Sequence, residues 1–171
     1  LLSPRRREAL AIEIKRIAQN CSVIKLSPRE IDNVVQSYRK LHKLNRLEAK
    51  AMAKVIEQLK PDIAYVDASD VFEERFRQHI TEYLPFKVKI VSEHKADRNY
   101  PIVSAASIIA KVERDREIAE LREKYGDFGC GYPVDPKTAS FLQQCQEKGY
   151  PDFVRKSWKP AKKAKSERTS H

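Results

Sequence analysis

Apolar residues recur every three or four positions along most of the chain, which is the spacing of helices with one buried face. Ser3 followed by Pro4 opens the first of them with a cap and a first-turn proline. Ser27 and Glu30 form a capping box for the second, and Pro61 ends the third. Helices are therefore predicted over residues 4–19, 28–35, 45–59, 71–83, 101–125 and 136–148.

The apolar positions also predict which side of each helix is buried. The inward residues of helix 45–59 should be Leu44, Leu47, Ala51, Val55 and Leu59. Those of helix 71–83 should be Phe72, Phe76, Ile80 and Tyr83. The long helix should use Val103, Ala106 and Ala110, flanked by Ile102, Ile109 and Val112, and the last helix Phe141, Leu142 and Cys145.

Three short apolar stretches indicate strands, at residues 21–26, 62–67 and 86–91. The nearly continuous apolar centre of residues 62–67 favours a buried parallel strand, whereas Lys87 and Lys89 give residues 86–91 one polar face and suggest an edge. Strands alternating with helices predict an α/β layered domain. Ligands in such sheets gather beyond the carboxyl ends of the strands, where Asp67 and the polar loop holding Asp97 should meet.

Composition indicates a globular protein whose basic charge favours a polyanionic partner, although such charge could also belong to a solvated surface or serve an anionic membrane. Of 171 residues 41% are hydrophobic, and 34 Lys and Arg against 24 Asp and Glu give a net charge of +10. No apolar run approaches the roughly 18 residues of a membrane-spanning helix, and we expect a soluble, cytoplasmic monomer. The three cysteines have no CxxC pairing, which argues against a disulfide framework or a zinc site.

Asp67 and Asp97 could together hold Mg²⁺ or Mn²⁺, because these hard cations prefer carboxylate oxygens. The alternative is that Asp97 belongs to a solvated turn or a cap, as aspartates ahead of helices often do. Two carboxylates are also fewer than the three or four of most such sites. The chain contains no GxxxxGK[ST], GxGxxG, HExxH or GxSxG pattern, which weakens ATPase, dinucleotide-binding, zinc protease and serine hydrolase interpretations.

Three further segments are candidates for contact with a polyanion. Residues 126–136 hold three of the four glycines around Tyr132, which could be a packing anchor or a stacking platform. Arg5, Arg6 and Arg7 lie at the positive end of the first helix and either contact a phosphate or are solvated. Residues 159–171 form a basic tail, and Trp158 should pack the preceding segment onto the body.

Several of these stretches, in this order, resemble ribonuclease HII, especially its archaeal form. The strongest are EHKAD at 93–97, PIVSAASIIAKVERDRE at 101–117, GCGYPVDPKT at 129–138 and VRKSW at 154–158. Residues 1–8, 44–56 and 65–71 match as well, so the resemblance covers nearly the whole chain.

The resemblance implies an RNase H-like α/β fold, with a mixed β-sheet flanked by helices and a C-terminal helical part. It implies a metal-dependent endoribonuclease that uses Mg²⁺ or Mn²⁺. Such an enzyme cleaves the RNA strand of RNA/DNA hybrids and ribonucleotides embedded in duplex DNA, leaving 3′-hydroxyl and 5′-phosphate ends. Two of the family's four metal-binding carboxylates correspond to Asp67 and Asp97, and the tyrosine of its GYP motif to Tyr132. Lys95, Ser104, Ser107 and Lys111 are expected to support substrate binding, and a sliding clamp is a possible partner.

The chain departs from the family pattern at its start, because the family's DEAGRG-like strand and its partner strand have no counterpart here. The first two strands of the fold, with the Asp-Glu pair that supplies the other two carboxylates, are therefore absent from these 171 residues. We expect that segment to exist outside them, and a self-contained 171-residue fold would contradict this. The expected organisation is an N-terminally incomplete core at 1–126, the glycine-rich loop and helical part at 127–158, and the basic tail at 159–171.

Three other functions remain open on the sequence. A hybrid-binding module without catalysis is allowed by the missing carboxylates, and metal-dependent cleavage would exclude it. A structural basic protein on RNA would bind without regard to a 2′-hydroxyl and lose affinity evenly with salt. Ribonuclease HIII is the third, although the motifs are closer to ribonuclease HII.

Overall fold

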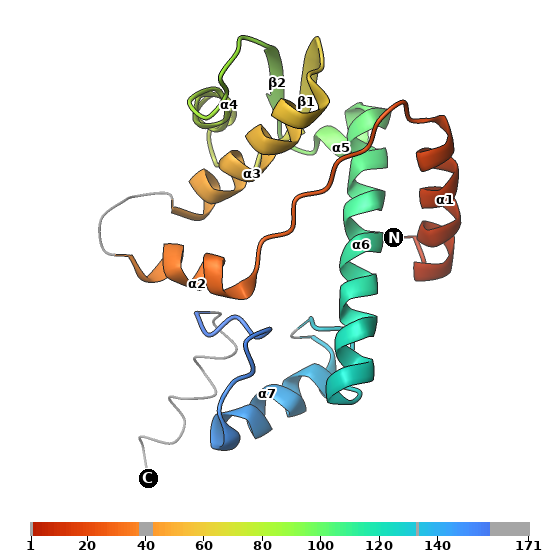
Figure 1. Ribbon diagram of the computed structural model, residues 1–171, viewed down its shortest axis with the longest axis vertical. Coiled ribbons are helices and arrows are strands. Elements are labelled where there is room, and N and C mark those ends of the chain that lie inside the picture. The colour runs from red at the N-terminus through yellow and green to blue at the C-terminus, as the bar shows by residue number, and fades with distance from the viewer. Residues whose placement is uncertain (1, 38–42, 133, 158–171) are drawn as a thin grey trace. The chain divides into compact units, whose positions relative to one another are not determined.

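The computed structural model of the protein describes residues 2–37, 43–132 and 134–157. The chain divides into two compact units, one made of Leu1–Lys25 and Lys40–Glu113 and the other of Leu26–Arg39 and Arg114–His171. The elements, labelled in Figure 1, are α1 (Pro4–Ile17), α2 (Pro28–Gln36), α3 (Lys43–Leu59), β1 (Ile63–Asp67), α4 (Glu73–Thr81), β2 (Lys89–Glu93), α5 (Ala96–Asn99), α6 (Pro101–Tyr125) and α7 (Pro136–Lys148). No helix in the described ranges is long and apolar enough to cross a membrane.

The helix starts predicted at residues 4, 28, 101 and 136 are confirmed, whereas α3 begins at Lys43, before the predicted Asn45, and α4 at Glu73, after the predicted Val71. Ser3 Oγ accepts from the backbone N of Arg6 at 3.3 Å, and α1 begins at Pro4. Ser27 and Glu30 form the expected capping box at the start of α2, and Asp135 caps α7. These side chains satisfy amide donors that the first turn of a helix leaves unpaired, so the sequence fixes the start of each helix locally.

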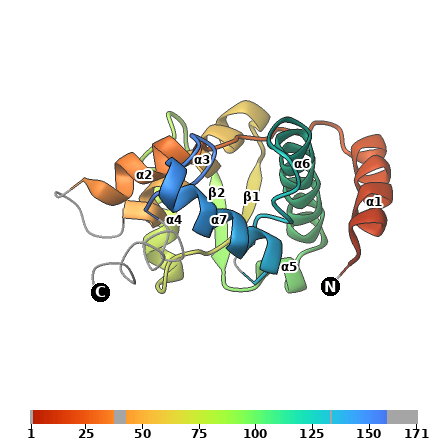
Figure 2. The ribbon, with the colours of Figure 1, turned by 90° about the horizontal axis from the view of Figure 1, so that it is seen from below.

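The described strands form a two-stranded parallel sheet (Figure 2), with Ile63 paired with Lys89 and Asp67 with Glu93. β2 begins three residues later than predicted because β1 offers no partner for residues 86–88. The parallel direction is as predicted, but β1 is not buried on both faces. Ala64 and Val66 are buried, whereas Ile63 and Tyr65 on the other face are 39% and 36% exposed.

The sheet packs on α3 and α4 through one buried cluster. It contains residues from both helices and both strands: Ala49, Ala53, Ile56, Ala64, Val66, Phe76, Ile80 and Ile90. Phe76 and Ile80 point inward as predicted, but Phe72 is 61% and Tyr83 is 37% exposed.

The predicted inward face of α3 is wrong, because Leu44, Leu47, Ala51, Val55 and Leu59 are only partly buried. Ala49 and Ala53 are buried instead, in the same cluster as the large side chain of Phe76. Small residues allow the backbone of one helix to approach another closely, so the alanines face α4.

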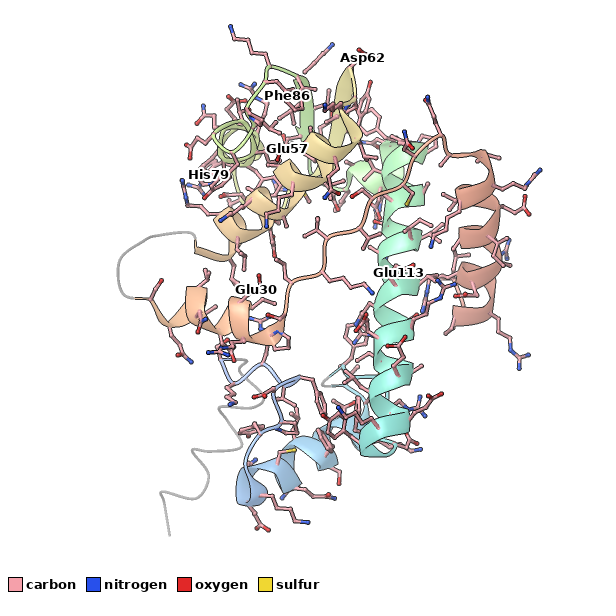
Figure 3. The ribbon with its side chains drawn as sticks, in the orientation of Figure 1. Glu30, Glu57, Asp62, His79, Phe86 and Glu113 are labelled. Carbon is pink, nitrogen blue, oxygen red and sulfur yellow. The ribbon has the colours of Figure 1, made fainter. Side chains whose placement is uncertain are left out.

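α1 packs against the first part of α6, where Ala11, Ile109 and Val112 form a second buried cluster. Lys15 Nζ donates to Glu113 of α6 at 3.0 Å, and Lys25 Nζ lies 3.7 Å from the same carboxylate, which is labelled in Figure 3. Val103, Ile109 and Val112 are buried as predicted, whereas Ile102, Ala106 and Ala110 are exposed. The buried stripe is therefore narrower than predicted and follows Val103, Ile109 and Val112.

The strand predicted at residues 21–26 does not form within the described part of the chain. Alternate residues of this segment are exposed and partly buried, as in a strand, but it pairs with neither β1 nor β2. A strand needs hydrogen-bonding partners for its backbone, so alternation alone is not sufficient.

The second unit is built from α2, the later part of α6, the glycine-rich loop and α7. Phe128, Phe141 and Phe153 form an aromatic cluster with ring centroids 5.2–6.0 Å apart. The buried carboxylate of Asp32 on α2 accepts from the backbone N of Lys156 at 2.8 Å and of Ser157 at 3.0 Å. This attaches the segment after α7 to α2. Trp158 and the tail at 159–171 lie outside the described residues.

Candidate active site

β1 and β2 end side by side at the carboxyl edge of the sheet. Asp67 and Glu93 are the last pair of the register, and the backbone N of Ala68 donates to the carbonyl oxygen of Glu93 at 2.9 Å. Each strand is then followed by a loop. Side chains at this edge are therefore presented together, which is the usual position of a site in a parallel sheet.

The segment that carries Asp97 lies against Asp67. The backbone N of Ala96 donates to Oδ1 of Asp67 at 3.2 Å, and Ala96 itself is only 1% exposed. Asp67 and Asp97 are each partly exposed. The two segments thus meet as the sequence predicts, while the role of the two aspartates as metal ligands stays a prediction.

Residues between β2 and α5 connect this segment to the loop after β1. His94 Nε2 donates to the carbonyl oxygen of Val71 at 3.2 Å, since a carbonyl can only accept, and His94 N donates to Glu73 at 2.6 Å. Lys95, the residue before α5, has a φ of 56°, a left-handed conformation that turns the chain sharply. Its side chain is exposed two residues before Asp97.

Tyr100 supports the same edge from the end of α5. Its hydroxyl donates to Glu93 Oε1 at 2.7 Å, and its ring lies 4.6 Å from that of Tyr65 on β1. The hydrogen bond to Glu93 raises the pKa of Tyr100, because the neighbouring carboxylate disfavours a phenolate. Glu93 is therefore used to hold α5 beside the sheet.

Asp67 and Asp97 differ from Asp70, which pairs with a cation, whereas Asp67 accepts from a backbone amide, as Glu73 does. Asp70 is bound by Arg75, Glu73 by the His94 backbone, and Glu93 by Tyr100. Within the described ranges neither Asp67 nor Asp97 pairs with a lysine, arginine or histidine. Two adjacent segments whose carboxylates have no cationic partner among the described residues suit a divalent cation, which would supply positive charge.

The donor set in this part of the chain is incomplete for a metal. The described residues contain no group of three or more His, Cys, Asp or Glu side chains placed to hold one. The chemistry of the two aspartates fits Mg²⁺ or Mn²⁺, but in number they make up part of a site, as the sequence indicates.

Ser104, Ser107 and Lys111 lie on one side of α6, at spacings of three and four residues. The serines are partly buried and Lys111 is exposed. The backbone N of Ser104 donates to the carbonyl oxygen of Tyr100 at 3.1 Å, so this helix begins directly after α5.

Tyr132 belongs to the second unit, where the glycine-rich loop is held by α6 and α7. Arg114 lies 3.9 Å above the centroid of the Tyr132 ring, and its Nη2 donates to the carbonyl oxygen of Cys130 at 3.0 Å. The ring is 49% exposed. One face of Tyr132 is thus covered by a cation, which fixes the orientation of the ring.

The turn before Tyr132 requires glycine. Gly129 has a φ of +84°, and a Cβ there would lie 2.2 Å from Oδ2 of Asp135. The backbone N of Cys130 donates to that carboxylate and holds the pKa of Asp135 below its usual range. Thr138 Oγ1 accepts from Gly131 N at 3.0 Å and donates to the carbonyl oxygen of Phe128 at 2.9 Å.

The sequence matches a family model described as Ribonuclease HII over residues 1–161. The chain belongs to the ribonuclease HII family. Ribonuclease HII of Pyrococcus abyssi is 45% identical, and the match covers 95% of this chain and 71% of the relative. Ribonuclease HII of Methanoregula boonei is 47% identical, and the match covers 99% of this chain and 80% of the relative. The family makes this protein an endoribonuclease of the ribonuclease H type.

Two solved structures share the fold. The ribonuclease H2 of Pyrococcus horikoshii superposes with a TM-score of 0.84 at 39% identity, over 99% of this chain and 80% of that one. The ribonuclease HII of Archaeoglobus fulgidus, solved in complex with PCNA, also superposes with a TM-score of 0.84. It is 43% identical, and the match covers 96% of this chain and 78% of that one. The RNase H-like α/β fold expected from the resemblance is therefore confirmed.

In this ribonuclease HII chain, sequence reasoning missed the residues that hold the two loops at the sheet edge. Asp70, His94 and Tyr100 each use a polar side chain to fix backbone or a neighbouring side chain. Asp70 had one usable signal, since an aspartate side chain in a turn often accepts from the backbone amide two residues later. The roles of His94 and Tyr100 depend on contacts with distant residues.

Of the arginine triplet, Arg5 and Arg6 are exposed at the start of α1. Arg7 Nη1 instead donates to the carbonyl oxygen of Leu2 at 2.8 Å. Exposure leaves the first two side chains accessible to an anion in solution, and their contact with phosphate stays a prediction.

Proposed function

We propose that Asp67 and Asp97 hold Mg²⁺ or Mn²⁺ at the carboxyl edge of the β1–β2 sheet for hydrolysis of RNA. The substrates are the RNA strand of RNA/DNA hybrids and ribonucleotides embedded in duplex DNA, and the products carry 3′-hydroxyl and 5′-phosphate ends. The observation that carries the proposal is the hydrogen bond from Ala96 N to Asp67 Oδ1, which brings the segment with Asp97 to the Asp67 carboxylate.

The residues of this chain contribute binding and orientation. Asp67 is fixed by the end of β1 and by the Ala96 amide, and Asp97 by the first turn of α5. A bound divalent cation supplies Lewis-acid activation of water and stabilises negative charge on the phosphate. The partial exposure of both aspartates leaves them accessible to solvent and to a phosphate group.

Five further residues are proposed to bind substrate. Tyr132, already oriented by Arg114, would place its free face against a sugar or base. Lys95 and Lys111 are exposed cations suited to phosphate oxygens, and Ser104 and Ser107 are hydroxyl donors on the same side of α6 as Lys111.

The test is Asp97→Asn in the complete protein, assayed for Mg²⁺-dependent cleavage of a DNA duplex that contains one ribonucleotide. The variant keeps the size of the side chain and removes its charge, so we expect the rate to fall by at least about a hundredfold. The matched control is Asp62→Asn, which makes the same change at an exposed residue at the other end of β1 (Figure 3) and should retain activity.

Near-wild-type cleavage by Asp97→Asn would reject the assignment of this residue. If the wild-type protein binds hybrids but does not cleave them with either metal, the chain is a binding module without catalysis. That result would contradict the activity expected from the family.

We also propose a sliding clamp as a partner, because the structurally similar ribonuclease HII of Archaeoglobus fulgidus was solved in complex with PCNA. The complete protein and the clamp of its own organism should co-elute in size-exclusion chromatography and bind with a measurable heat. Absence of binding at micromolar concentrations would reject the partnership without affecting the proposed catalytic residues.

A further inference from the structure

The loop after β1 exposes a pair of large apolar side chains next to the candidate site. Val71 is 79% and Phe72 is 61% exposed. They follow Asp67 in the sequence, and the carbonyl of Val71 is bound by His94, three residues before Asp97. The exposed pair therefore belongs to the same two loops as the proposed metal ligands.

The surface is held rigidly from beneath. Phe72 N donates to Oδ1 of Asp70 at 3.1 Å, and Arg75 Nε donates to Oδ2 at 2.8 Å. Asp70 is 1% exposed, so this anchor lies inside the protein. Arg75 in turn places its guanidinium 4.8 Å from the centroid of the Phe72 ring. An aromatic ring braced in this way costs little further ordering when it binds a ligand.

We propose that Val71 and Phe72, braced by Arg75, form a contact surface for the sugars and bases of the nucleic-acid duplex beside the cleaved bond. The proposal rests on the proposed function, because a duplex whose phosphate reaches Asp67 and Asp97 must pass close to the loop that follows β1. The net charge of the whole chain, +10, favours a polyanion over a neutral partner. A ring with one face on a guanidinium and the rest exposed suits stacking on a base or sugar.

The contact has a distinctive dependence on salt. Because Arg75 is paired with Asp70, this surface contributes apolar contact to the affinity and little net charge. Loss of Phe72 should therefore weaken binding at every salt concentration, without changing the slope of log affinity against log salt. Loss of a phosphate contact would reduce that slope.

The experiment measures fluorescence anisotropy of a labelled duplex with one ribonucleotide, bound by the complete protein in EDTA so that no cleavage occurs. Phe72→Ala should raise the dissociation constant about tenfold with the salt slope unchanged. Phe72→Trp should restore the affinity, and its tryptophan fluorescence should be quenched by the duplex relative to the wild-type signal. The control is Ile17→Ala, a residue of α1 that is 75% exposed, and it should leave the affinity unchanged.

An affinity of Phe72→Ala within twofold of wild type would overturn the proposal, as would a Phe72→Trp fluorescence that does not respond to the duplex. The proposal would also be overturned if Phe72→Ala reduced self-association of the protein and left its affinity for the duplex unchanged. The surface would then be an interface between copies of the chain. Thermal unfolding of Phe72→Ala should match wild type because the side chain is exposed. Binding in EDTA does not use the metal. A failure of Asp97→Asn to reduce cleavage would therefore overturn the catalytic assignment without changing the effect expected of Phe72→Ala on affinity.

Discussion

Arg75 makes a two-pronged contact with the buried carboxylate of Asp70, through Nε and Nη2. The pair closes the turn between β1 and α4, because Asp70 also accepts from the backbone N of Phe72. The hydrogen bonds from Arg75 hold the pKa of Asp70 far below its usual range, despite burial, which acts in the opposite direction. The turn that follows Asp67 is therefore fixed by a charged group inside the protein.

Asp70→Asn should destabilise the protein by about 2 kcal/mol at pH 7, because a charged acceptor of several hydrogen bonds is lost. Because the pKa of Asp70 is lower in the folded than in the unfolded state, the carboxylate adds stability at pH values above its unfolded-state pKa of about 4. This stability is lost as the pH falls from there toward the folded-state pKa. Wild-type stability should thus decline on acidification below about pH 4 more steeply than that of the variant. Urea unfolding between pH 3 and 7 measures both effects, and equal slopes in acid would contradict the role of Asp70.

A second buried aspartate, Asp32, should control the attachment of the segment after α7. Burial raises the pKa of Asp32, but hydrogen bonds from Ser157 and Lys156 outweigh that effect and leave the pKa below its usual value. In Asp32→Asn the new amide group cannot accept all of these donors, so we expect a loss of about 2 kcal/mol. Hydrogen exchange at the Ser157 amide should be faster in the variant than in wild type. In wild type it should also become faster as the pH falls below about 4, once the rates are corrected for the pH dependence of intrinsic exchange.

Glycine substitutions distinguish backbone strain from steric conflict in the loop before Tyr132. Gly129 and Gly126 have similar φ values of +84° and +86°, but only at Gly129 does a Cβ meet neighbouring atoms. Both alanine variants should lose about 1 kcal/mol from backbone strain. Gly129→Ala should in addition displace Asp135 and reduce cleavage of a duplex with one ribonucleotide, whereas Gly126→Ala should not. Equal activities would show that the conformation of this turn is not needed.

Capping signals made the helix starts predictable. Ser3, Ser27 and Asp135 act within one turn of the chain, so their effect does not depend on the rest of the fold. The meeting of Asp67 with the Asp97 segment was predictable for another reason, because parallel strands end at the same edge of their sheet.

Burial could not be predicted where two faces of a helix are both apolar. α3 carries alanine, valine and leucine on several sides, and the positions of Phe76 and Ile80 decide which side is buried. Residues 21–26 show the same limit for strands, because a strand exists only where another pairs with it. The hydrogen bond from Tyr100 to Glu93 also depends on three-dimensional contact.

We expect Asp67 and Asp97 to bind one divalent cation together or two adjacent ones. The most direct measurement is an anomalous difference map from crystals of the complete protein grown with Mn²⁺. We predict a peak within about 2.5 Å of a carboxylate oxygen of Asp67 and, at the same ion or at a second one about 4 Å away, of Asp97. Carboxylates that point away from each other, with Mn²⁺ bound to neither, would contradict the account.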